Sequence, residues 1–155
     1  MAYAGGVVLV GDRVVVSRGQ VRSRSRRHVF DFGCVGAAVA GADVGGFADR
    51  LAGDVRTYRT ERGDLGIDPF TRLASDLADE SDASTVLAVT ADGGVATDDV
   101  AAFGSGASVA SGALEAGHDP DGILDKTTLA RSTLSAAAER DAGTGTEFDV
   151  YRLPT

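Results

Sequence analysis

The sequence has little cysteine, little lysine and no long apolar run. Cys34 is the only cysteine, which excludes an internal disulfide framework. No apolar run reaches the roughly 20 residues that a membrane span needs. Met1-Ala2-Tyr3 leads directly into strand-like residues rather than into a signal peptide. No internal repeat or low-complexity linker is present. We therefore expect a soluble cytoplasmic protein in which residues 1–155 form one domain.

The choice of charged residue types is unusual. Lys126 is the only lysine, whereas arginine occurs 14 times, and the formal net charge is −8. Aspartate far outnumbers glutamate, a pattern typical of proteins from salt-loving archaea, because short carboxylates hold water and keep a surface soluble. So acidic a chain makes nucleic acid an unfavourable partner. The composition also leads us to expect no membrane partner.

Apolar patterning predicts strands that alternate with pairs of helices. Residues 6–16 and 29–40 are apolar and β-branched, and each can form two strands around a polar turn. The helical pattern of Phe47, Leu51, Val55 and Tyr58 indicates a helix capped by aspartate. We expect strands at 6–16, 29–40, 85–90, 95–103 and 148–153, a hairpin turn at 91–94, and helices over 43–63, 68–78, 105–117 and 121–139.

Two helix starts can be placed from single residues. Asp68 is predicted to cap the second helix, with Pro69 at its first position. Ser105 or Ser108 can cap the third helix. Strands followed by two helices, twice over, with a last strand, make an α+β pattern in which stacked sheets bury the apolar strands under outer helices.

Segment 17–28 interrupts the acidic pattern with a group of arginines. In an extended strand, alternate side chains share a face, which would place Arg22, Arg24 and Arg26 together. One interpretation is an edge strand that charge protects against aggregation. Another is a contact surface for an acidic neighbour, and nucleic acid is a third. We favour an interface between copies of this chain, formed by Arg18, Arg22, Arg24, Arg26 and Arg27.

The segment AAFGSGASVASGALEAG, residues 101–117, joins a strand-like run to a helix through small residues. Glycine there allows close backbone approach and positive φ. About 25 residues later, a helix end leads into Arg140-Asp141-Ala142-Gly143-Thr144-Gly145 and a final strand. This order, with the Asp12-Arg13 pair near the start and an Ala40-Gly41 turn before the first long helix, resembles proteasome β subunits. These are amino-terminal-nucleophile (Ntn) hydrolases, and the resemblance implies a four-layer αββα sandwich.

The resemblance also implies roles for individual residues. In this family an amino-terminal threonine supplies its hydroxyl as nucleophile and its α-amine as base. By position, Asp12 corresponds to the supporting acid and Gly41 to the oxyanion-donating turn glycine. Ser105 corresponds to the GSG serine, and Asp141 and Thr144 to a supporting pair in the late loop. The same residues could instead order tight turns by hydrogen bonding.

Central parts of this machinery are missing from the sequence. The family places its threonine about sixteen residues before the acid, a separation implied by the resemblance, whereas only eleven residues precede Asp12 and none is Thr, Ser or Cys. We expect no propeptide, because the chain begins within the first strand. The family's lysine falls on His28, which supplies an ammonium-like charge at pH 7 only if its pKa is raised. The family also carries more strand before the GSG loop, so the fold is expected to be trimmed at the amino terminus and in one hairpin.

The sequence thus predicts a catalytically silent proteasome-like subunit that acts by assembling into a ring, stack or filament, or by docking onto a proteasome. The alternative is an Ntn-fold peptidase or amide hydrolase with a relocated nucleophile, drawn from Ser17, Cys34 or Ser105, and His28 as base. Cys34, in an apolar run, is interpreted as a buried small hydrophobe. We expect no metal and no cofactor in either case.

Overall fold

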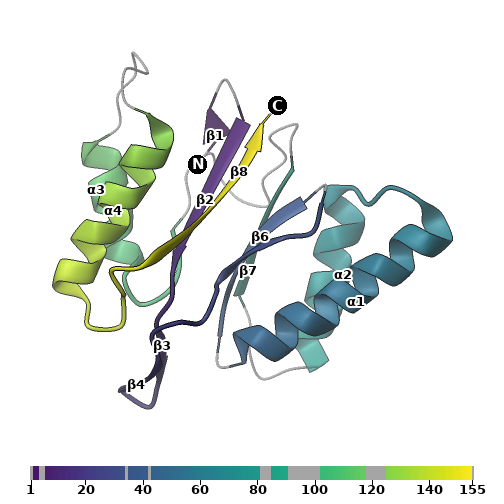
Figure 1. The fold of residues 1–155 in the computed structure, drawn as a ribbon, viewed down its shortest axis with the longest axis horizontal. Coiled ribbons are helices and arrows are strands. Elements are labelled where there is room, and N and C mark those ends of the chain that lie inside the picture. The colour runs from purple at the N-terminus through teal and green to yellow at the C-terminus, as the bar shows by residue number, and fades with distance from the viewer. Residues whose placement is uncertain are drawn as a thin grey trace.

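The fold is a stack of four layers (Figure 1). The computed structural model describes residues 2–3, 6–33, 35–41, 43–80, 85–90, 102–117 and 125–154. Among them, two three-stranded antiparallel sheets lie between two pairs of helices, with α1 and α2 on one side and α3 and α4 on the other. This confirms the α+β sandwich predicted from the sequence.

The first and last strands share a sheet. Its order is β1-β2-β8, and β2 pairs with β8 along its whole length, from Gly6 opposite Pro154 to Asp12 opposite Phe148. The second sheet has the order β5-β6-β7, and a separate hairpin pairs β3 with β4. The strands are β1 (Ala2–Tyr3), β2 (Gly6–Asp12), β3 (Val15–Ser17), β4 (Gln20–Ser23), β5 (Val29–Asp31), β6 (Val35–Ala40), β7 (Thr85–Thr90) and β8 (Phe148–Pro154).

The helices begin and end close to the predicted positions. They are α1 (Val44–Arg62), α2 (Ile67–Glu80), α3 (Ala107–Ala116) and α4 (Lys126–Arg140). Asp43 caps α1, because its Oδ1 accepts a hydrogen bond from the Gly46 amide at 3.1 Å. Gly63 ends the helix with a φ of 87°, a conformation that costs glycine little. The predicted first helix is therefore confirmed at both ends.

Three predicted helix starts were wrong in detail. The Phe70 amide donates to the Gly66 carbonyl, so α2 begins before Asp68, and Asp68 lies in the first turn rather than at the cap. Asp125 caps α4 by accepting from the Thr128 amide at 3.0 Å, so the helix starts at Lys126 rather than near 121. No serine caps α3, whose N-cap is Gly106.

Two apolar clusters hold the layers together. The larger lies between the β5-β6-β7 sheet and helices α1 and α2, and its fully buried side chains include Phe70, Leu51 and Val39. The smaller lies between the two sheets, where Val7 and Leu9 of β2 meet Val29 of β5. Burial of this kind contributes most of the stability of a domain of this size.

Some sequence predictions concern residues outside the described ones. Cys34 and the turn predicted at 91–94 belong to this group, as does most of the strand predicted at 95–103. Within the described part of the chain, no helix combines the length and the apolar character that crossing a membrane requires.

Candidate functional site

The structure brings five of the six predicted site residues together on the wall of one cavity, and the sixth, Asp141, lies behind Ser105 and Thr144. The cavity has a volume of about 350 Å³ and lies where β2 and β6 meet α3 and α4. Asp12, His28, Gly41, Ser105 and Thr144 all line it, and most of the remaining wall is apolar. These residues come from distant parts of the chain, so the sheet stacking and the two glycine-rich loops create the site.

Asp141 links the two glycine-rich loops. Its Oδ2 accepts hydrogen bonds from the Ser105 hydroxyl at 2.6 Å and from the Thr144 hydroxyl at 2.7 Å. Its Oδ1 accepts from the Gly143 amide at 3.2 Å. The bond from Ser105, and after it the bond from Thr144, lowers the pKa of the Asp141 carboxyl, because both stabilise the ionised form. The Ser105 proton is thus directed to Asp141. Ser105 does not cap α3, because it precedes the N-cap residue, Gly106.

Asp12 ties the end of β2 to the late loop. Its Oδ1 accepts from the Val14 amide at 2.9 Å, and its Oδ2 accepts from the Gly145 amide at 3.1 Å. Both glycine-rich loops thus lie near Asp12, as their shared assignment to the family's site implies. In this geometry both oxygens of Asp12 order backbone turns.

His28 is held against β6 in a half-buried position. Its backbone carbonyl accepts from the Val39 amide at 2.8 Å, and its Nε2 atom is buried with no hydrogen-bond partner among the described residues. Burial lowers the pKa of the imidazole, and the nearby Asp12 carboxylate only partly opposes this shift. The side chain is therefore neutral at pH 7.

The buried imidazole predicts a pH dependence of stability. Because the folded protein lowers the pKa of His28 below its usual value of 6.5, the unfolded chain binds this proton more readily. The free energy of unfolding should therefore fall as the pH drops through and below that value. Measured by urea denaturation between pH 7.5 and pH 5, the free energy of unfolding should fall more steeply with decreasing pH for the wild type than for His28→Gln. His118→Gln, which changes the only other histidine, should keep the wild-type slope. Equal slopes for His28→Gln and the wild type would contradict this assignment.

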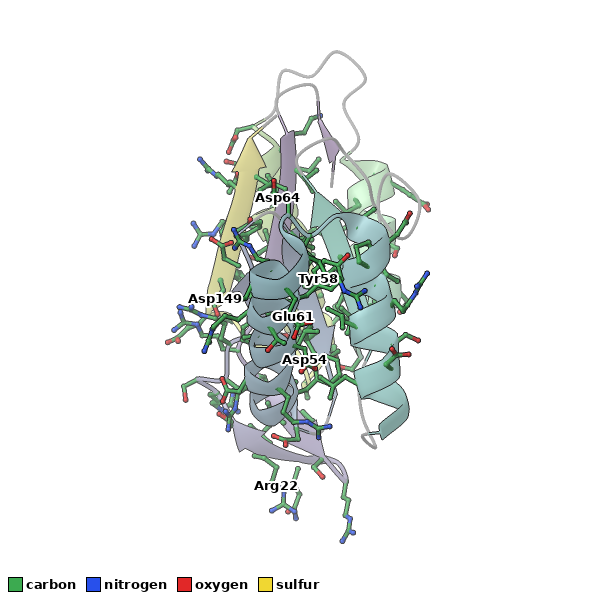
Figure 2. The ribbon with its side chains drawn as sticks, turned by 90° about the vertical axis from the view of Figure 1, so that its right-hand side faces the viewer. Arg22, Asp54, Tyr58, Glu61, Asp64 and Asp149 are labelled. Atoms are coloured by element: carbon green, nitrogen blue, oxygen red, sulfur yellow. The ribbon has the colours of Figure 1, made fainter. Side chains whose placement is uncertain are left out.

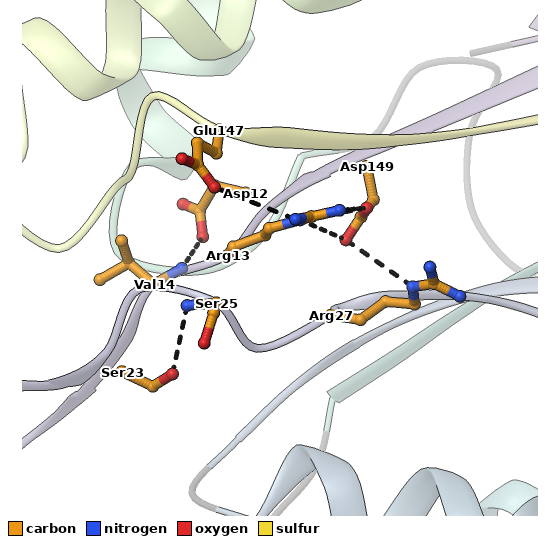
Figure 3. A network of polar contacts seen from close by, with 8 residues as sticks. All are labelled: Asp12, Arg13, Val14, Ser23, Ser25, Arg27, Glu147 and Asp149. Atoms are coloured by element: carbon orange, nitrogen blue, oxygen red, sulfur yellow. Dashed lines mark hydrogen bonds and ion pairs between the residues drawn. The ribbon is translucent and has the colours of Figure 1, made fainter.

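An ion-pair network lies beside the site (Figure 3). Arg13 Nε donates to Asp149 Oδ2 at 3.1 Å and Arg13 Nη2 donates to Oδ1 at 2.5 Å, while Glu147 lies 3.9 Å from Arg13. Sequence reasoning placed Arg13 in a pair with Asp12 and missed Asp149. No local sequence pattern indicates this bond, because it depends on the antiparallel pairing of the first and last strands, which sets Asp149 opposite Gly11.

The five arginines of segment 17–28 divide into two groups. The Arg26 guanidinium lies beside Gly45 at the start of α1, and Arg27 Nε lies 3.9 Å from Asp149 Oδ2. Arg18, Arg22 and Arg24 are exposed, and no described carboxylate lies within ion-pair distance of them. The expected single face of Arg22, Arg24 and Arg26 was wrong, because β4 ends at Ser23 and the chain bends there.

The described residues offer few other chemical groups at the site. They contain no cluster of three or more His, Cys, Asp or Glu side chains that could hold a metal ion. Ser17, one of the proposed relocated nucleophiles, lies in β3 and not on the cavity wall. Ser105 is the remaining candidate hydroxyl of that proposal within the described site.

Comparisons with known proteins agree with one another. Residues 70–153 match the sequence pattern of the family described as "Proteasome subunit". The chain is 30% identical to "Proteasome subunit beta" of Natrialba magadii, over 90% of this chain and 66% of that protein. It is 30% identical to "Proteasome subunit beta 1" of Hyperthermus butylicus, over 95% of this chain and 83% of that protein. The chain thus spans slightly less than two thirds of the first relative's length.

A solved structure of similar fold covers nearly the whole chain. This is eukaryotic HslV from Trypanosoma brucei, with a TM-score of 0.68 and 25% sequence identity. The superposition covers 99% of this chain and 96% of that chain.

Proposed function

Since this chain belongs to the proteasome subunit family, we propose that it is a subunit without peptidase activity. It works by assembling with copies of itself into a ring, stack or filament, or by docking onto a proteasome. Its acidic, arginine-rich composition supports a salt-rich cytoplasm as its setting, where a hydrated carboxylate surface stays soluble.

The state of His28 carries the first part of this proposal. The resemblance assigns a lysine to this position, whose ammonium helps to set the electrostatics of the nucleophile. In its place stands an imidazole that is half-buried, has a lowered pKa and is neutral at pH 7. A neutral imidazole provides no positive charge to stabilise a developing alkoxide. The substitution therefore removes a catalytic contribution that no other described residue on the cavity wall replaces.

The remaining polar groups of the site form hydrogen bonds with one another or with the backbone. Asp141 accepts hydrogen bonds from the Ser105 and Thr144 hydroxyls, and Asp12 accepts hydrogen bonds from two backbone amides. This arrangement keeps the shape of the family's site while its hydrogen bonds stabilise loops. A peptidase with a relocated nucleophile is the second candidate, and one observation favours it: Ser105 and His28 line the same cavity.

Peptide hydrolysis separates the two candidates. Wild-type protein, purified free of any host proteasome, should release no fluorophore from standard proteasome peptide substrates above the background set by Ser105→Ala. After incubation with an electrophilic inhibitor, intact-protein mass spectrometry should show no covalent adduct. Turnover that Ser105→Ala abolishes, or an adduct mapped to Ser105, would overturn the proposal and establish the hydrolase, because groups that form one catalytic unit fail together.

A further inference from the structure

Part of one edge of β2 has no neighbouring strand among the described residues. β8 pairs with one edge of β2 from Gly6 to Asp12, whereas β1 covers only Gly6 and Val7 on the other edge (Figure 1). Between Leu9 and Asp12, no described backbone group forms a hydrogen bond with that second edge. Successive residues of a strand direct their N–H and C=O groups to opposite edges, so alternate residues of this segment lack a backbone partner there. We call residues 9–12 on this side the open edge.

The open edge borders the cavity of the candidate site. Leu9, Val10, Gly11 and Asp12 all line the cavity, together with residues 102–107. The volume of about 350 Å³ lies within the range of protein ligand sites. Backbone N–H and C=O groups that face a largely apolar wall are costly when they stay unpaired. An extended polypeptide provides donors and acceptors at the spacing of a strand, so it is the ligand that this edge fits.

The direction of β1 indicates how an added strand would run. β1 is antiparallel to β2, and its Ala2 lies opposite Val7. A strand that continues the line of β1 in the same direction begins beside Asp12 and ends beside β1. Antiparallel pairs are slightly more stable per residue than parallel pairs. The amino end of the added strand would therefore lie beside Asp12.

The polar groups at this end of the cavity suit a cation. Asp12 is the charged side chain on the described cavity wall, since His28 is neutral at pH 7. Each Asp12 carboxylate oxygen accepts one backbone amide, and an ionised carboxylate can accept further donors. His28 Nε2 is buried without a described partner, and it accepts a hydrogen bond when Nδ1 carries the proton. An α-ammonium group, which provides a positive charge and several donors, matches these acceptors.

We propose that the open edge binds the free amino-terminal segment of a partner polypeptide as an added antiparallel strand. About four residues pair with β2 through backbone hydrogen bonds, the mode known as β-strand addition. The α-ammonium group lies against Asp12 and His28. Alternate side chains of the added strand face α3 and α4, where Ala110 and Leu114 line the cavity, so apolar residues suit these positions.

Fluorescence anisotropy with a synthetic peptide tests the proposal. The probe is Ala-Val-Ala-Val-Gly-Ser with a free amino terminus and fluorescein at its carboxyl end. Salt of about 1 M shortens the Debye length to about 3 Å and screens long-range attraction to the acidic surface. The full chain should bind this probe saturably, and acetylation of the amino terminus should weaken binding at least tenfold. Absence of saturable binding at millimolar protein, or equal affinity for the acetylated probe, would overturn the proposal.

Two methylated probes test the strand pairing itself. Methylation of both valine amide nitrogens and methylation of the second alanine and the glycine amide nitrogens block opposite edges of the peptide. One of these probes should lose at least tenfold in affinity, and the other should bind as the parent probe does. Equal affinities of the two would overturn strand addition.

A cavity-filling variant tests the location of the bound strand. Ala107 is half-buried on α3 and lines the cavity, whereas Ala116 is exposed on the same helix and does not. Ala107→Leu should weaken binding of the probe at least tenfold, and Ala116→Leu should bind as the wild type does. Circular dichroism and melting temperature would verify the fold of both. Equal affinities of the two variants would overturn the cavity as the binding site.

A charge variant tests the position of the amino end. Asp12→Asn should abolish the preference for the free amine over the acetylated probe. Asp54→Asn removes the same charge from an exposed position of α1, on the side of the molecule that Figure 2 shows, and should keep the preference. The preference is a ratio of two affinities of one variant, so partial loss of stability does not alter it. An Asp12→Asn protein that keeps the preference would overturn the placement of the α-ammonium group.

The inference rests on the proposed function only in stating that the bound peptide stays intact. Mass spectrometry of the probe after incubation separates the two proposals. Binding of a peptide that is recovered intact would support both. Binding followed by cleavage would support the open edge as a strand site and overturn catalytic silence, whereas absence of binding would overturn the strand site and leave the proposed function standing.

Discussion

Replacing Gly36 by valine should lower the free energy of unfolding by about 3 kcal/mol, because the core between the two sheets has no space for a side chain there. Gly36 lies in β6, and a Cβ atom at this position would overlap the ring of Tyr151 in β8, in the opposite sheet. The Tyr151 hydroxyl lies 3.4 Å from Asp31 Oδ1, at the long end of hydrogen-bond distances. To make room for the valine side chain, the two sheets would have to move apart, and these sheets position the candidate site.

Urea denaturation of Gly36→Val and of a glycine control measures this effect. Gly53 lies in α1, and a Cβ atom at this position would meet no neighbouring side chain within 4 Å. Gly53→Ala should therefore stabilise the protein by about 0.5–1 kcal/mol through helix propensity. A Gly36→Val protein as stable as the wild type would show that the sheets pack differently from the described structure.

Truncating Phe70 to alanine should lower the free energy of unfolding by about 3–5 kcal/mol. Phe70 of α2 is fully buried, and its ring packs on that of Phe32 with centroids 5.2 Å apart and planes at 55°. Alanine would remove the apolar area and leave a cavity between α2 and the β5-β6-β7 sheet. Such a loss is a large part of the stability of a domain of this size.

The Phe70 experiment has two controls. Phe70→Leu keeps most of the apolar volume, so its free energy of unfolding should fall less than that of Phe70→Ala. Thr71→Ala changes an exposed neighbouring position and should alter the free energy of unfolding by less than about 0.5 kcal/mol. Equal small losses for Phe70→Ala and Thr71→Ala would place Phe70 outside the core.

Local patterns in the sequence predicted most of the elements. The spacing of Phe47, Leu51 and Val55 predicted α1, and the structure buries all three. The capping role of Asp43 was readable because a short carboxylate before a helix meets unsatisfied amides. The start of α2 was misplaced, since the helix begins at Ile67 and its first backbone bond, from the Phe70 amide to the Gly66 carbonyl, involves no side chain that a sequence pattern could indicate.

The sequence predicted only part of the candidate site. The order of motifs and the resemblance they carry predicted that Ser105, Asp141 and Asp12 meet, and the hydrogen bonds from Ser105 to Asp141 and from Gly145 to Asp12 confirm it. The hydrogen-bonded ion pair between Arg13 and Asp149 could not be predicted from the sequence. It depends on the register of strands that lie more than a hundred residues apart.

The sequence by itself determined the layered α+β class and the acidic composition, because periodicity and charge are properties of neighbouring residues. The groups at the site were indicated by the family resemblance that its motifs carry. Only the tertiary structure decided that His28 is half-buried, with a lowered imidazole pKa, since burial depends on β6 and on the stacked sheets. It alone also divided the arginines, because the bend after Ser23 turns Arg26 and Arg27 toward their own chain and leaves Arg22 and Arg24 exposed. Contacts between distant segments are set by packing, which no local pattern encodes.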